Sequence, residues 1–247
     1  MKRYLIFLIL VVSLPRLKAS NEVKKQFMAD LNSCLKSMAE SNFLIEINYN
    51  LYNNNLEGKA VETTKCKLGK YQNNIFTENQ KMISYSNSKY QANIYTNDKI
   101  VVLNKSIIKR KLKMDQLLMT DSNMWSNYSD VILLSDSLNI RTYKVQFLPT
   151  SPLLAFQISI DIEKKMITKN IIFYNPKYAD YLTRSAYKKN VKSNNKPIIV
   201  LDFLNRKSLT KEDESLFYCS NIQIEKKGAV KLLNNLSTFK KYNYLKK

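Results

Sequence analysis

The sequence contains no histidine, only three glycines and five prolines, and an odd number of cysteines, three. Without histidine the chain has no Ser-His-Asp or Cys-His catalytic group, no imidazole proton relay and none of the usual zinc or non-haem iron ligand sets. Neither G-x-x-x-x-G-K-[ST] nor G-x-G-x-x-G occurs, so phosphate-binding glycine loops are excluded as well. These absences predict a protein that has no metal, no cofactor and no catalytic residues.

Paired carboxylates and Ser/Lys dyads are the catalytic groups that the composition leaves open. Asp161 and Glu163 are two residues apart in a strand-like segment, the spacing that places both acids of a glycosidase on one face. The simpler interpretation, which we favour, is a solvent-facing polar side at the end of a hairpin. A histidine-free hydrolase therefore stays as a third hypothesis.

The charge is strongly one-sided, with 40 Lys and Arg against 20 Asp and Glu, a formal net charge of +20. Only six of the basic residues are Arg. Bidentate recognition of phosphates and bases favours Arg, whereas Lys acts as a diffuse point charge. The Lys excess beside an Asn excess fits an AT-rich coding bias better than a polyanion site. We expect no nucleic-acid partner, but we do expect attraction to anionic membrane surfaces.

Residues 1–19 have the pattern of a secretory signal. Lys2 and Arg3 precede an apolar run over residues 4–14, Pro15 ends the run, and Ala19 offers a cleavage point. Eleven apolar residues are too few to span a bilayer of about 30 Å. The sequence thus predicts export to the periplasm or cell envelope, with residues 20–247 as a single β-rich domain. Because the leader carries four basic residues and no acids, the mature chain keeps a charge of +16.

The three cysteines allow one disulfide and one free thiol in an oxidising compartment, in three pairings. Cys34 falls on the apolar face of a predicted helix and is expected to be a buried thiol. Cys66 and Cys219 fall in strand-like segments and are the preferred pair.

Hydrophobic periodicity divides the chain into helices and strands. Residues 22–40 have apolar side chains at spacings of three and four, and residues 43–52 alternate with period two, as in a half-buried antiparallel strand. Further helices are predicted at 107–120, 130–137 and 176–188. Further strands are predicted at 59–67, 74–78, 81–86, 90–96, 99–103, 140–148, 153–162, 166–174, 197–204, 217–225 and 229–233. The basic stretch 240–247 is expected to fray.

This order of elements resembles the periplasmic lipoprotein-carrier fold of the LolA and LolB type, in particular its divergent Bacteroidetes members. The resemblance is carried by the patterns of residues 43–52, 90–104 (YQANIYTNDKIVVLN) and 156–174 (FQISIDIEKKMITKNIIFY). It implies an α+β fold in which a curved antiparallel half-barrel sheet is covered by a few helices. It also implies an apolar interior that holds the acyl chains of a lipid or lipoprotein. Arg141, which opens a predicted strand, is the candidate for the basic residue of the concave face.

Two functions follow from this pattern. The first is a non-enzymatic envelope protein that binds an acyl chain or lipidated partner in an apolar cavity of the sheet. Its expected ligand-binding residues are Ile45, Tyr49, Phe156, Ile158, Phe173 and Arg141. The alternative is an interaction or assembly protein whose sheet core has no cavity, and which docks on a partner protein or an anionic membrane.

Overall fold

The computed structural model describes residues 20–86, 90–105, 128–178, 196–216, 222–224, 230–232 and 243–246. The helices in these residues are α2 (Ser20–Glu40) and the short 3-10 helices η1 (Pro176–Tyr178) and η2 (Lys211–Leu216). The strands are β1 (Phe43–Asn53), β2 (Glu62–Tyr71), β3 (Asn74–Glu78), β4 (Met82–Ser86), β5 (Tyr90–Tyr95), β6 (Ile100–Lys105), β7 (Tyr128–Ser137), β8 (Ile140–Phe147), β9 (Leu153–Asp161), β10 (Met166–Tyr174), β11 (Pro197–Ser208), β12 (Ile222–Ile224), β13 (Val230–Leu232) and β14 (Asn243–Lys246).

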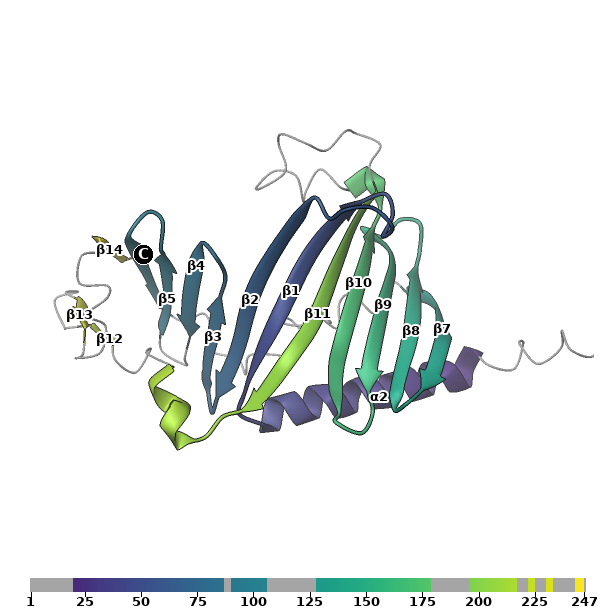
Figure 1. Ribbon diagram of the computed structural model, residues 1–247, viewed down its shortest axis with the longest axis horizontal. Helices are drawn as coiled ribbons and strands as arrows, with labels where there is room; N and C mark the ends of the chain where they lie inside the picture. Colours follow the sequence, from purple (N-terminus) through teal and green to yellow (C-terminus); the bar gives the residue numbers. More distant parts are fainter. Residues whose placement is uncertain are drawn as a thin grey trace, which may run out of the picture.

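Twelve of these strands form one open sheet in the order β14-β6-β5-β4-β3-β2-β1-β11-β10-β9-β8-β7, while β12 pairs with β13 separately (Figure 1). Neighbouring strands of the large sheet are antiparallel except β14, which is parallel to β6. Helix α2 crosses one face and packs against β7, β9 and β10. The expected class, a curved antiparallel sheet with helical cover, is confirmed.

Strand register assigns each side chain to one of two faces, because paired residues share a face and successive residues alternate. We call the face that α2 covers the helix face and the opposite one the outer face. A large core lies on the helix face of β1, β2 and β7–β11, and it joins Ile45, Tyr143 and Phe156 to Phe27 and Leu31 of α2. All five side chains are at most 2% exposed.

A second core lies on the outer face of the other half of the sheet. The pairings Leu44↔Gly69, Gly69↔Phe76, Phe76↔Tyr85 and Tyr85↔Ala92 put these residues opposite to Ile45. Phe76, Tyr85 and Ala92 are buried together with the residues Tyr71, Ile94, Val101, Leu103 and Leu209. On the helix face the same strands carry polar groups, where the Ser84 hydroxyl donates to Asn93 Oδ1 at 2.8 Å. The apolar face of the sheet therefore changes sides near β2 and β3.

The segments expected at 22–40, 43–52, 74–78 and 166–174 match α2, β1, β3 and β10 within two residues, and the other strand predictions overlap observed strands in the described residues. The helix predicted at 130–137 is wrong, because that segment pairs with β8 as the edge strand β7. The predicted fraying of residues 240–247 is wrong over Asn243–Lys246, which adds β14 to the sheet.

Some expectations fall outside the described residues. These are the leader at 1–19, the helix at 107–120, and residues 179–188 of the helix at 176–188, of which η1 forms the beginning. The division into a leader and one domain stays a prediction. Among the described helices, none is long and apolar enough to cross a membrane.

Candidate functional site

The apolar layer between α2 and the helix face is the site that the sequence pattern predicts. Phe27, Leu31, Cys34 and Met38 recur every three or four residues along α2, which places them on one side of the helix. All four are at most 2% exposed and belong to the large core. The interface is thus a continuous apolar layer formed by one amphipathic helix and several strands.

The structure brings four of the six predicted ligand-binding residues into this core or to its margin. Ile45, Phe156 and Ile158 are at most 1% exposed, and Tyr49 packs against them from a half-buried position. Phe173 lies on the outer face instead, because it pairs with Ala155 and Ile198, one residue out of phase with Phe156. There it packs against the residues Ile171, Ile198 and Val200.

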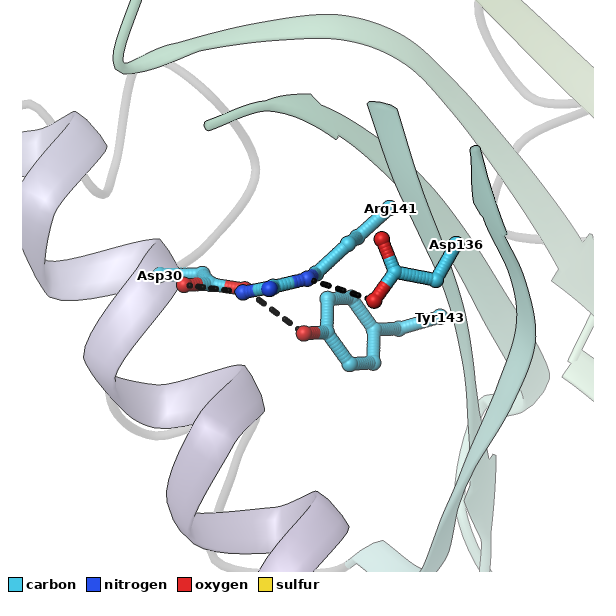
Figure 2. A network of polar contacts seen from close by, with 4 residues as sticks. All are labelled: Asp30, Asp136, Arg141 and Tyr143. Carbon is cyan, nitrogen blue, oxygen red and sulfur yellow. Dashed lines mark hydrogen bonds and ion pairs between the residues drawn. The ribbon is translucent and has the colours of Figure 1, made fainter. Parts of the chain in front are cut away.

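Arg141, the sixth predicted residue, belongs to a polar latch between α2 and the β7–β8 hairpin, formed with Asp30, Asp136 and Tyr143 (Figure 2). Arg141 Nη1 donates to Asp30 Oδ2 at 3.1 Å, and its Nε donates to Asp136 Oδ2 at 3.0 Å. The Tyr143 hydroxyl donates to the same Asp30 oxygen at 2.6 Å. One helix carboxylate therefore accepts hydrogen bonds from two side chains of β8.

The latch combines charge with burial. Hydrogen bonding to Asp30 raises the pKa of Arg141 although partial burial opposes it, so the guanidinium stays cationic. Burial raises the pKa of the Tyr143 phenol, and the hydrogen bond to Asp30 raises it further. The Tyr143 ring is fully buried and lies 5.1 Å from the Phe27 ring, centroid to centroid. The latch thus joins the core rather than presenting Arg141 to solvent.

A second set of polar contacts holds the C-terminal end of α2, whereas the latch lies at the middle of the helix. Lys70 Nζ donates to the Ser41 carbonyl oxygen at 3.1 Å, and Arg206 Nη2 donates to Ser41 Oγ at 2.6 Å. The Arg206 guanidinium also lies over the Phe43 ring, 5.4 Å from its centroid. Desolvation by burial lowers the pKa of both Lys70 and Arg206. Cations at a helix C-terminus favour the helix dipole, so this end of α2 is stabilised electrostatically.

The predicted thiol and carboxylate sites have different outcomes. Cys34 is fully buried, as expected, and burial raises its pKa to about 12. Cys66 is half-buried and has no disulfide partner among the described residues, and because Cys219 lies outside them the disulfide between the two stays a prediction. Asp161 Oδ1 accepts from the Lys164 backbone N–H at 2.8 Å, and Glu163 Oε2 accepts from Asn139 Nδ2 at 2.7 Å. Asp161, only 7% exposed, closes its own turn and is not solvent-facing as expected, whereas the exposed Glu163 joins this turn to the β7–β8 turn.

Groups of acidic and cysteine side chains able to hold a metal ion do not occur in the described part of the chain. Sequence reasoning singled out Arg141 but missed Asp30, Asp136 and Tyr143. The sequence did contain one signal for the latch: Asp30 is a single acidic residue on the apolar side of the helix, next to Phe27 and Leu31. The side chain of Asp30 is only 15% exposed. The spacing of the apolar residues along the helix predicts this burial, because it places Asp30 on their side of the helix.

No family model matches the chain, and neither does any curated protein sequence. Among solved structures, the fold is similar to an uncharacterised conserved protein of Thermus thermophilus, with 8% identity over 90% of this chain and 99% of that one and a TM-score of 0.48. It is also similar to the Pseudomonas aeruginosa MucA/MucB complex, with 11% identity over 75% and 59% and a TM-score of 0.41.

A third similar structure is the Mycobacterium tuberculosis lipoprotein LppX, with 8% identity over 76% of this chain and 98% of that one and a TM-score of 0.36. The LolA-like resemblance expected from the sequence holds at the level of architecture. All three TM-scores lie below 0.5, so the functional argument rests on the geometry of this chain alone.

Proposed function

We propose that this chain is a non-enzymatic, exported envelope protein that binds an acyl chain or a lipidated partner between α2 and the helix face of its sheet. The observation that carries the proposal is the single amphipathic helix lying over a wide apolar face, with polar contacts at its middle, through Asp30, and at its C-terminal end. In this proposal the helix separates from the sheet as one unit when these contacts open. The leader-like residues 1–19 supply the expectation of export.

The burial of the predicted ligand-binding residues sets a condition on the ligand. Lifting α2 exposes the four buried side chains of the helix itself. If each contributes about 1.5–3 kcal/mol, this costs about 6–12 kcal/mol. An acyl chain restores about 0.8 kcal/mol for each buried methylene group. About 8–15 methylene groups are therefore needed to offset the lost contacts. The geometry favours long acyl chains over short ones.

The proposal is tested by native mass spectrometry of the purified protein with extraction of bound lipid, followed by titration with octanoate and palmitate probes. We expect co-purified lipid, or binding of palmitate and not of octanoate. Asp30→Asn weakens the latch and should speed palmitate uptake, whereas Asp98→Asn, an exposed turn residue, should not. A protein that is always empty, and that binds palmitate in neither the wild type nor Asp30→Asn, contradicts acyl binding.

A second function, docking on a partner protein or an anionic membrane without an internal ligand, is favoured by the end of the β7–β8 hairpin. Leu138 is 94% exposed at its turn, and Leu134 and Ile132 of β7 are 48% and 37% exposed. Docking on a membrane predicts salt-sensitive sedimentation with vesicles of phosphatidylglycerol. Leu138→Asn should weaken that binding, and palmitate should leave it unchanged.

A further inference from the structure

A polar cleft of about 500 Å³ lies on the outer face of the sheet, on the side opposite to α2. Its walls come from β1, β2, β11 and the end of β3 with the turn that follows it, and they include Glu46, Asn48, Lys65, Gln80 and Asn205. The volume lies within the range of about 300–1,000 Å³ that small-molecule sites occupy. The cleft is separate from the apolar layer under α2, so a ligand here is independent of acyl binding.

The charges of the cleft are balanced. Lys67 Nζ lies 3.1 Å from Glu78 Oε2, and Lys65 and Glu46 add one charge of each sign. A small anion meets two carboxylates here, and a small cation meets two ammonium groups. This local balance gives the cleft no net preference for small anions or small cations.

The remaining polar groups suit hydroxyl groups. The amides of Asn48 and Gln80 each present donors and an acceptor in one plane, which matches a hydroxyl that both donates and accepts. Asn79 Oδ1 accepts from the backbone N–H groups of Lys81 and Met82, both at 2.9 Å, which fixes the turn that carries Gln80. Leu204, 39% exposed among these polar groups, offers an apolar surface to the C–H groups of a sugar ring.

The floor of the cleft contains an irregularity of the sheet. The pairing of β1 with β11 shifts register between Leu44 and Glu46, and Asn205 on β11 has a φ of 44°, which is uncommon for a residue other than glycine. This geometry lets Asn205 Nδ2 donate to Glu46 Oε2 at 3.0 Å across the two strands. The bulge thus orients a carboxylate within the cleft.

We propose that this cleft binds a neutral saccharide of one or two rings, through the amides of Asn48 and Gln80, the charged groups of Glu46 and Lys65, and the apolar surface of Leu204. The test is titration of the isotope-labelled protein with maltose and with N,N′-diacetylchitobiose, followed by amide chemical shifts. We expect saturable shifts at Asn48, Lys65 and Gln80 for at least one sugar, with a dissociation constant on the order of 1 mM.

The double variant Asn48→Ala, Gln80→Ala should raise that dissociation constant at least about tenfold, which corresponds to about 1.4 kcal/mol. Gln157→Ala serves as the matched control, since Gln157 is a half-buried amide on the outer face of β9, away from the cleft. Inorganic phosphate is the competing probe. Two results overturn the proposal: saturable shifts at these residues with phosphate but not with either sugar, or no saturable shift with any probe.

Discussion

Tyr143 combines a fully buried ring with a hydroxyl that donates to Asp30 across the helix–sheet interface, at 2.6 Å. Tyr143→Phe keeps the ring and removes this hydrogen bond to a charged group. We expect the free energy of unfolding to fall by about 1.5–3 kcal/mol, measured from the midpoint of urea unfolding. Tyr95→Phe, at an exposed position, is the control and should change it by less than about 0.5 kcal/mol.

An unchanged midpoint for Tyr143→Phe would show that the Asp30 carboxylate is fully satisfied by Arg141. In that case the double variant with Asp30→Asn should be no less stable than Asp30→Asn alone. A non-zero coupling energy between the two positions, by contrast, measures the hydrogen bond directly.

Cys34 has its pKa raised to about 12, first by burial and then by the nearby Asp30 carboxylate. The native state thus keeps the proton that an unfolded thiol loses near its ordinary pKa of 9.0. The contribution of Cys34 to stability is complete below about pH 9 and is lost as the pH rises from there toward about 12.

Alkylation checks this thiol chemistry. Three units of pKa reduce the thiolate fraction by about 1000-fold, so iodoacetamide at about pH 8 should leave native Cys34 unmodified. The half-buried Cys66 has its pKa raised by burial alone and should react first wherever it is reduced. Peptide mapping by mass spectrometry measures the alkylation rates of Cys34 and Cys66. The protein in concentrated urea is the reference. Equal rates in the native protein would contradict the buried position of Cys34.

Among the elements, α2 depends on its apolar stripe. Leu31 is 2% exposed at the centre of the helix interface, so Leu31→Ala leaves a cavity and should lower the free energy of unfolding by about 2–5 kcal/mol. Lys36→Ala, on the exposed side of the same helix, should change it by less than about 0.5 kcal/mol. Thermal or urea unfolding followed by circular dichroism makes the comparison. Equal losses would mean that packing of the apolar stripe does not stabilise the fold more than the exposed side of α2 does.

The elements also show what local sequence patterns determine. The period of the apolar residues predicted α2 and most strands, because each pattern reflects one buried face. It failed at β7, where the run Val131, Ile132, Leu133 and Leu134 has no clear period. Two register shifts in the pairing of β7 with β8 interrupt the alternation of its side chains. The pairing with β8 makes this segment a strand. Neither the shifts nor the pairing can be seen in the sequence of the segment itself.

The same contrast between local pattern and strand pairing explains which residues of the site were predicted from the sequence. Ile45, Phe156 and Ile158 were placed correctly on one face by their alternation within β1 and β9. Phe173 was misassigned to that face, because residues 171–173 are all apolar and only the pairing of β9 with β10 decides which of them share the face of Phe156. The latch escaped prediction because Asp30 and Tyr143 are 113 residues apart in the sequence.

At the scale of the whole molecule, two cores on opposite faces share one sheet. Loosening one core should therefore leave the other largely intact. In hydrogen exchange read by mass spectrometry, Leu31→Ala should increase exchange in β8–β10 much more than in β4 and β5, whose buried residues belong to the outer-face core. A uniform increase across the sheet would instead show that the two cores unfold as one cooperative unit.

The pairing of β1 with β11 joins strands that are far apart in the sequence, and this affects the order in which the sheet forms. Phe43 near the start of the described chain pairs with Ser208 near its end, while the neighbouring ladders β2–β6 and β7–β10 are built largely from successive hairpins. Hairpins close short loops and form early, whereas a pairing of this sequence separation closes a very long loop. During synthesis β1 can pair with β2 soon after both are made, but its other edge stays unpaired until β11 has been made.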